Sequence, residues 1–291
     1  MTARHSFASG AALGIVAGGG ELPAAIAASA RDSGRDVFVV ALEGMAKEEE
    51  VASFPHAFAS IGEFGKVLKL LASAGCSDVT FAGRVPRPKF SGLKLDARGA
   101  LALPRIIAAA RKGDDALMRA VLSLFEKEGF KVIGSADAAR DLLMPPGPLG
   151  KIAPAEEHQA DIAQGMGVVR AIGALDIGQA CAVCEGVVLA VEAAEGTDAM
   201  LRRVGELPET LRGSVKARRG VLVKSPKPAQ ERRVDLPVIG WRTVELAAAA
   251  GLAGIAVQAG AALILDRRAV AQAADQAGLF VFGLSPGDFP E

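Results

Sequence analysis

A proline-rich segment in the last third of the chain combines the residue types that phosphate chemistry uses. It reads VKSPKPAQERRVDLPVIG over residues 223–240 and continues an apolar, strand-like run. Its prolines forbid a helix, so we expect extended backbone. Clustered cations repel one another unless an anion joins them. A pyrophosphate would do so, with lysine as a point charge and arginine as a bidentate fork. The cations are Lys224, Lys227, Arg232 and Arg233.

Asp235 is the acid that lies beyond these cations. Side chains alternate along extended backbone, so Arg233 and Asp235 are expected on the same face. Beside cations the Asp235 carboxyl should stay ionised, and it would then bind a metal or orient a water. The alternative is a solvated loop with a local ion pair between Arg233 and Asp235. The residue types alone do not decide between the two.

A second polar group, Glu195-Gly196-Thr197-Asp198, follows the apolar run VVLAVEA. Ligands of α/β proteins bind at strand ends, and two carboxylates three residues apart across a turn can share a divalent cation. Oxygen ligands favour Mg2+ or Mn2+. Capping of a following helix by Thr197 or Asp198 is the simpler explanation, but it does not account for two acids flanking Gly-Thr.

A glycine turn, Gly18-Gly19-Gly20, sits between a predicted strand and a predicted helix that begins near Leu22 and Pro23. Glycines allow a phosphate to approach the backbone, and a helix N-terminus supplies N–H donors. The dinucleotide fingerprint GxGxxG fails because Pro23 replaces its third glycine, although Glu43 ends the next strand where an acid would bond a ribose. The turn therefore predicts a nucleotide ligand but gives little support for NAD in particular. The alternative is a tight turn that binds no ligand.

The pair Cys181-Ala-Val-Cys184 has the spacing of a metal or redox site, but its surroundings predict two strands around Glu185-Gly186. Residues i and i+3 of a strand point to opposite faces, so one metal would not easily reach both thiols. There is no second CxxC and the three histidines are scattered. Any metal is therefore expected on carboxylates. Three cysteines do not make a disulfide framework, which fits a reducing compartment.

The strands and helices that must position these groups follow different patterns in the two halves. The first half alternates strand-like and helix-like runs, which predicts a Rossmann-like α/β domain over 13–144, with a parallel sheet covered on both faces. The Pro- and Gly-rich residues 145–154 predict a linker. Residues 155–287 predict a C-terminal mixed α/β domain, and the candidate catalytic groups described above lie in it. Within the first half we expect a loop over 84–99 and helices over 103–113 and 115–129, the second capped by Asp114 or Asp115.

Composition restricts the class of protein. The 33 acids balance 33 lysines and arginines, so a nucleic-acid partner, which calls for a basic surface, is not expected. No apolar run reaches the roughly 18 residues of a membrane span. We expect a cytoplasmic protein. The apolar C-terminal half is compatible with a homodimer.

Several blocks of this sequence resemble one family, in order from about residue 13 to the C-terminus. The chain is similar to the UDP-2,3-diacylglucosamine pyrophosphatases of lipid A biosynthesis, in their two-domain, metal-dependent type rather than the calcineurin-like type. Glu231 is a conservative departure, since the family more often has Asp there. The matching blocks are LGIVAGGGELP, GEFGKVLKLL, FAGRVPRP, GDDALM, LDIGQA, AVEAAEGTDAMLRR, VLVKSPKPAQERRVDLPVIG and GLAGIAVQAG.

The resemblance implies hydrolysis of the pyrophosphate of UDP-2,3-diacylglucosamine to UMP and 2,3-diacylglucosamine 1-phosphate (lipid X). Asp235 and Asp198, with Glu195, would hold Mg2+ (or Mn2+) or the attacking water. The cations would offset the charge on the phosphoryl oxygens, and Thr197 would donate a hydrogen bond nearby. The lipid would bind between the two domains, and because the substrate is a lipid the protein would contact the inner membrane only at its periphery and transiently. Residues expected to contact the substrate are Gly18, Gly19, Gly20, Leu22, Arg84, Thr197 and Arg232.

Two other classes compete with this hydrolase. A lipid-binding or carrier protein would use the same cations to hold a phosphorylated lipid without cleaving it, but it would gain nothing from Glu195 and Asp198 beside the phosphate. An NAD-dependent oxidoreductase would use the glycine turn and Glu43, but Pro23 disfavours it, and it leaves the cationic segment unexplained.

Overall fold

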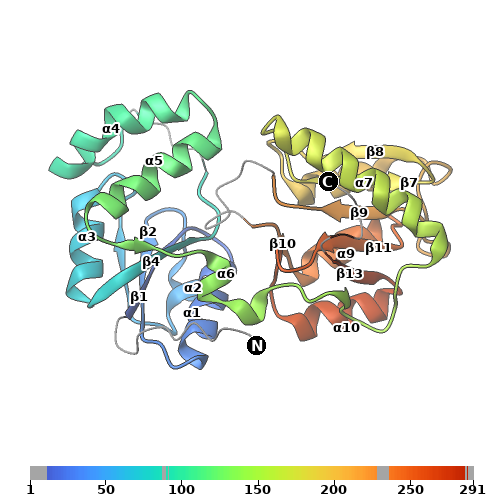
Figure 1. The fold of residues 1–291 in the computed structure, drawn as a ribbon, viewed down its shortest axis with the longest axis horizontal. Coiled ribbons are helices and arrows are strands. Elements are labelled where there is room, and N and C mark those ends of the chain that lie inside the picture. Colours follow the sequence, from blue (N-terminus) through green and yellow to red (C-terminus); the bar gives the residue numbers. More distant parts are fainter. Residues whose placement is uncertain (1–11, 87–89, 91, 228–235, 286, 288–291) are drawn as a thin grey trace. The chain divides into compact units, whose positions relative to one another are not determined.

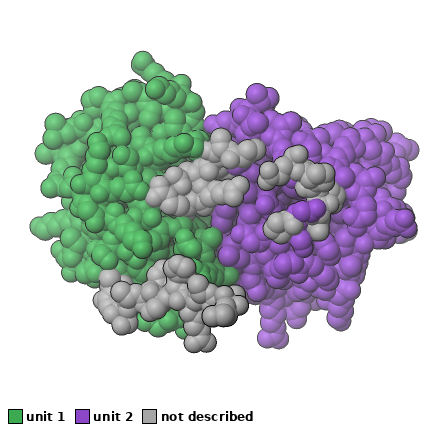
Figure 2. All heavy atoms as spheres, viewed as in Figure 1, with its two compact units in different colours: residues 1–140 green, residues 141–291 purple. Residues whose placement is uncertain are grey.

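The structure is a computed structural model that describes residues 12–86, 90, 92–227, 236–285 and 287. It divides into two compact units, residues 1–140 (unit 1) and 141–291 (unit 2), coloured separately in Figure 2. A parallel sheet in unit 1 and a mixed sheet with helices in unit 2 confirm the predicted fold class. The domain bounds 13–144 and 155–287 stay a prediction.

Unit 1 contains a five-stranded parallel sheet in the order β3-β2-β1-β4-β5, which is the order of the first five strands of the Rossmann fold. Crossover helices join the strands, as in Figure 1. The strands are β1 (Ala12–Ala17), β2 (Val37–Leu42), β3 (His56–Ala59), β4 (Cys76–Ala82) and β5 (Lys131–Val132). The helices are α1 (Leu22–Asp32), α2 (Glu48–Val51), α3 (Phe64–Ser73), α4 (Ala97–Ala110), α5 (Asp114–Lys127) and α6 (Ser135–Ala138).

Apolar side chains on alternate strand positions explain this packing. On one face, Phe81 of β4 packs edge-on against Phe125 of α5, with ring centroids 4.9 Å apart, and Phe125 also contacts Phe64 of α3. Gly14 of β1 lies on the same face, where a β-carbon would lie 2.4 Å from Leu71 Cδ2 of α3. The absence of a side chain there lets α3 approach the sheet closely.

Two predictions for the α4–α5 region were wrong. The helix expected at 103–113 begins at Ala97, inside the stretch predicted as a loop, because the Asp96 carboxylate caps it by accepting the Gly99 N–H at 2.7 Å. Pro104 therefore lies within a helix rather than near its start. The N-cap of α5 is Gly113, while Asp114 is already helical.

Unit 2 is built on a six-stranded mixed sheet in the order β6-β13-β11-β9-β7-β8, in which β9, β11 and β13 are parallel. The strands are β6 (Gly147–Pro148), β7 (Ala180–Cys184), β8 (Val187–Val191), β9 (Val221–Lys224), β11 (Gly254–Gln258) and β13 (Phe280–Leu284). β10 (Val238–Ile239) and β12 (Leu263–Ile264) form a separate parallel pair. The helices are α7 (Gln159–Ala174), α8 (Thr197–Glu206), α9 (Trp241–Ala249) and α10 (Arg267–Ala277).

The two faces of this sheet form two separate hydrophobic clusters. Val221 and Val223 of β9 pack with Ile162 of α7 on one face. Leu222, between them, packs on the other face with Met200 of α8 and Val244 of α9. This alternation is the period of a strand buried on both faces, and it places Lys224 on the same side as Leu222, toward α8.

The segment predicted as a linker, 145–154, lies in unit 2 and contributes β6 to its sheet, where Gly147 and Pro148 pair with β13. The preceding Met144 is buried and donates its N–H to Ala262 O at 2.9 Å. In the described part of the chain, no helix is long and apolar enough to cross a membrane.

Candidate active site

One edge of the unit 2 sheet collects polar residues from several strands. The carboxyl ends of β9, β11 and β13 meet there because these strands are parallel neighbours. The start of β7 and the end of β8 reach the same edge, since Ala180 lies opposite Lys224 and Cys181 opposite Val191. Ligands of α/β proteins bind at such edges. We call the following residues the carboxyl-edge cluster: Gln179, Glu192, Thr197, Lys224, Ser225 and Gln258.

Lys224 ends β9 and is only 4% exposed. Its ammonium donates to the Thr197 hydroxyl at 3.0 Å and to the Val238 carbonyl at 3.3 Å. A buried ammonium is costly unless it is hydrogen-bonded, so these two contacts help to keep the charge at the sheet edge. The cation that the sequence placed at a strand end is therefore held within the protein, not on a solvated loop.

Thr197 links Lys224 to a carboxylate that sequence reasoning did not single out. Its hydroxyl donates to Glu192 Oε1 at 2.8 Å, and the other oxygen of Glu192 accepts the Gln179 N–H at 3.3 Å. Glu192 is only 7% exposed. The signal that could have found it is an acid directly after the apolar run VVLAV, at a strand end.

Ser225 and Gln258 complete the cluster. The Ser225 N–H donates to Gln179 O at 3.1 Å, and its hydroxyl donates to Gln258 Oε1 at 3.1 Å. The Gln179 side-chain oxygen is buried and has no hydrogen-bond partner within the described structure. Buried polar atoms are usually paired, so a donor from a ligand or water would complete this atom.

The two acids predicted to share a divalent cation each form an ion pair with an arginine. Asp198 Oδ2 lies 3.2 Å from Arg242 Nε, and Glu195 pairs with Arg203. The pKa of Glu195 is lowered, first by its own backbone N–H and also by Arg203. Among residues with described positions, no three His, Cys, Asp or Glu side chains group closely enough to hold a metal. The described residues therefore do not by themselves form the expected metal site.

The cationic segment is described only in part. Lys227 Nζ lies 2.7 Å from Asp176 Oδ1. Arg232, Arg233 and Asp235 lie outside the described residues, and their predicted roles stay predictions.

The glycine turn of unit 1 is closed by its own contacts. Gly18 donates to Ala82 O at 2.8 Å, and Gly19 and Arg84 exchange backbone hydrogen bonds in a small antiparallel bridge. A β-carbon on Gly18 would lie 2.5 Å from Arg84 O. Close packing thus explains the first glycine without a ligand. The side chain of Arg84 is exposed and Leu22 begins α1, and substrate contact by these residues stays a prediction.

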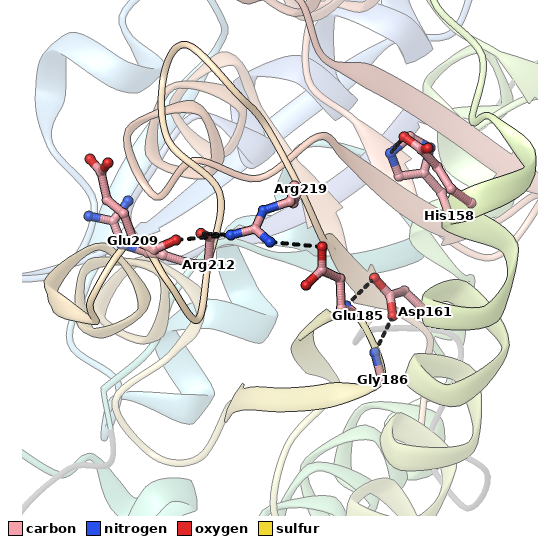
Figure 3. Close-up of polar contacts among 8 residues, drawn as sticks. His158, Asp161, Glu185, Gly186, Glu209, Arg212 and Arg219 are labelled. Atoms are coloured by element: carbon pink, nitrogen blue, oxygen red, sulfur yellow. Dashed lines mark hydrogen bonds and ion pairs between the residues drawn. The ribbon is translucent and has the colours of Figure 1, made fainter.

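At the opposite edge of the unit 2 sheet, polar groups bond to one another and close loops and turns of the chain (Figure 3). Asp161, 4% exposed, accepts the backbone N–H groups of Glu185 and Gly186 at 2.9 and 2.8 Å and so closes the β7–β8 turn. Arg219 donates to Glu185 Oε1 at 2.8 Å and to two backbone carbonyls of the 207–220 loop.

Cys181, in β7, is one of the two cysteines with the spacing of a metal or redox site. Burial raises the pKa of the Cys181 thiol to about 12, which keeps it protonated.

Comparisons with known proteins point to one family. The model of the LpxI N-terminal domain matches residues 12–142, and that of the LpxI C-terminal domain matches residues 145–282. A protein of Caulobacter vibrioides, named UDP-2,3-diacylglucosamine pyrophosphatase LpxI, is 54% identical over 278 residues, covering 96% of this chain and 99% of that protein. A solved structure titled CobK precorrin-6A reductase covers 97% of this chain and 90% of its own at 14% identity, but its TM-score of 0.31 supports no conclusion.

Proposed function

This chain belongs to the LpxI family, and on that premise we propose that it hydrolyses the pyrophosphate bond of UDP-2,3-diacylglucosamine in lipid A biosynthesis. The products would be UMP and 2,3-diacylglucosamine 1-phosphate. The observation that carries the proposal is the 54% identity, over 96% of this chain, to a protein with that name. Both family domains are found in this chain, one over residues 12–142 and the other over residues 145–282.

The carboxyl-edge cluster supports a site for a phosphorylated substrate in unit 2. Lys224 is a buried cation at the end of a parallel strand, and Lys227 follows it three residues later. We propose that their charges offset the negative charge that spreads over the phosphoryl oxygens as water attacks phosphorus. Asp235 would orient that water, and Arg232 and Arg233 would bind the phosphates as bidentate forks.

Dependence on a divalent cation, Mg2+ or Mn2+, is a separate part of the proposal. Such an ion would act as a Lewis acid on a phosphoryl oxygen. Asp198 and Glu195 supply the kind of oxygen ligand these ions take, but each is paired with an arginine in this structure. Binding would require those pairs to open, with Asp235 as the third ligand.

We further propose that the enzyme works in the cytoplasm and meets the inner-membrane surface only transiently to reach its lipid substrate. A homodimer is compatible with the apolar composition of the C-terminal half.

The test is to incubate the purified protein with UDP-2,3-diacylglucosamine and detect UMP by mass spectrometry, with Mg2+, with Mn2+ and with excess chelator. UMP release with metal that stops with chelator is the expected result. UMP release that chelator leaves unchanged would overturn the metal dependence alone. Substrate that binds but stays intact under every metal would replace hydrolysis by lipid binding.

A further inference from the structure

Two side chains of opposite charge are buried on unit 2 without touching directly. Lys224 and Glu192 are 4% and 7% exposed, and the Thr197 hydroxyl lies between them. Thr197 Oγ1 lies 3.0 Å from Lys224 Nζ and 2.8 Å from Glu192 Oε1. They come from three elements, since Lys224 ends β9, Thr197 begins α8 and Glu192 follows β8.

The chemistry of the three groups fixes the direction of both hydrogen bonds. An ammonium only donates and an ionised carboxylate only accepts, whereas a hydroxyl does both. The proton of Thr197 is therefore directed at Glu192, and a lone pair of its oxygen faces Lys224. Loss of the Glu192 charge would free that proton to turn, and the acceptor offered to Lys224 would no longer be fixed.

The intervening hydroxyl also sets how strongly the two charges interact. Coulomb attraction falls with distance, so a carboxylate one hydroxyl away neutralises the ammonium less than a direct ion pair would. Glu192 thus contributes only part of the compensation of the buried cation.

We propose that Glu192 is a positioning residue that acts through the Thr197 hydroxyl to hold the Lys224 ammonium in place for the substrate pyrophosphate. The proposal rests on the proposed function. It differs from the role that the sequence predicts for Thr197, which is contact with the substrate and a hydrogen bond donated nearby. Here Thr197 accepts from Lys224 and donates to Glu192.

The experiment compares turnover of UDP-2,3-diacylglucosamine by wild type, Glu192→Gln, Thr197→Val, Thr197→Ser and the double variant Glu192→Gln/Thr197→Val. A hydrogen bond to a charged group sets the scale of the effect, so both single variants should lower kcat on the order of 10- to 100-fold, with KM changing less. Thr197→Ser keeps the hydroxyl and should stay within about threefold of wild type. The double variant should be no slower than Thr197→Val, because both changes break one chain.

Asp161→Asn is the matched control, because it alters a buried carboxylate of the same unit at the opposite sheet edge. It should lower Tm while leaving the kcat of the folded enzyme unchanged. The inference is wrong if Glu192→Gln and Thr197→Val keep the wild-type kcat. It is also wrong if Asp161→Asn lowers kcat as much as these two variants do when Tm falls by the same amount. The same holds if Thr197→Ser is as slow as Thr197→Val.

Binding of inorganic pyrophosphate, measured by calorimetry, separates this inference from the proposed function. If wild type binds pyrophosphate but releases no UMP, the proposed function fails. The inference then holds only if Glu192→Gln and Thr197→Val weaken pyrophosphate binding equally. If wild type releases UMP and the variants match it, only the inference fails. A wild type that neither binds pyrophosphate nor cleaves the substrate overturns both.

Discussion

The carboxyl edges of the two sheets use their polar groups differently. In unit 1, the backbone of the glycine turn bonds to the segment after β4, through the bridge between Gly19 and Arg84. The ion pairs nearby, such as Lys94 with Glu63 at 2.7 Å, involve an exposed lysine. In unit 2, the lysine at the strand end is buried and donates to the Thr197 hydroxyl, which in turn donates to the buried Glu192 carboxylate.

The difference shows which edge carries features that folding alone does not require. Glycines and exposed ion pairs cost little and are explained by close packing and loop closure. Burial of an ammonium and a carboxylate is unfavourable unless both are hydrogen-bonded, and well-packed apolar residues often stabilise a core as well or better. We therefore expect the reaction to depend on the unit 2 edge, and unit 1 substitutions at the glycine turn to act on stability.

The largest effect should come from Lys224→Met, which keeps an apolar stem and removes the charge. We expect kcat for UMP release to fall by at least about 100-fold, or about 2.7 kcal/mol, because the transition state loses a fixed cation. Lys216→Met makes the same change at an exposed site in the 207–220 loop and should stay within about twofold of wild type. Near-full activity in a folded Lys224→Met protein would remove the carboxyl-edge cluster from the site.

A smaller effect, on stability, is expected from Gly18→Ala. The new β-carbon would lie 2.5 Å from Arg84 O, a backbone atom that cannot simply move aside, so we expect a loss of about 1–3 kcal/mol in the free energy of unfolding. Urea unfolding measures it. Gly167→Ala in α7, where a β-carbon meets nothing within 4 Å, should instead stabilise by up to about 1 kcal/mol.

Steady-state kinetics of Gly18→Ala distinguish packing of the glycine turn from substrate binding by it. If the glycine turn only packs, the folded fraction of Gly18→Ala should keep its kcat and KM. A KM raised tenfold or more at unchanged Tm would assign the turn to substrate binding and contradict the contrast between the two edges.

The smallest effect concerns pH at the unit 1 edge. The ion pair with Lys94, the Ser60 N–H and Lys66 lower the pKa of Glu63 to about 2, from an ordinary value near 4.5. Because the folded pKa is depressed, the stabilisation is present above about pH 4.5 and is lost as pH falls toward 2. Thermal unfolding should therefore give a Tm difference between wild type and Glu63→Gln that is largest above pH 5 and shrinks toward pH 2.

Glu21→Gln, which neutralises an exposed carboxylate of the same unit, serves as the matched control. Because Lys94 is exposed, salt should also reduce the Glu63 effect. A Tm difference that stayed constant from pH 7 to pH 2 would show that Glu63 acts by packing and not by its charge.

Much of the fold could be predicted from local pattern. Alternating strand and helix runs predicted the parallel sheet, and the strands around Glu185-Gly186 are β7 and β8. The failures have a local cause too: Pro104 suggested a helix start, but the cap at Asp96 began α4 earlier. The strand β6 within the predicted linker was missed because a Gly-Pro pair reads as a turn, and its pairing partner β13 lies far along the chain.

The candidate site could be predicted only in part. The position of Lys224 at a strand end could be predicted, because an apolar run followed by a lysine marks the point where a strand reaches the sheet edge. The arginine partners of Asp198 and Glu195 were not, since Arg242 and Arg203 lie on helices whose facing depends on packing. Asp235, which the sequence predicts to bind a metal or orient a water, lies outside the described residues.

The sequence by itself determined the family, the parallel sheet of the first half and the cation at the end of β9, because motifs, hydrophobic periodicity and residue type are all local properties of the chain. Only the tertiary structure decided that Glu192, Thr197 and Lys224 form one hydrogen-bonded chain. Glu192 directly follows β8, Thr197 begins α8 and Lys224 ends β9, and the antiparallel register of β7 with β8 and β9 brings these positions together. Register and helix facing arise from core packing across distant segments, and no local pattern encodes them.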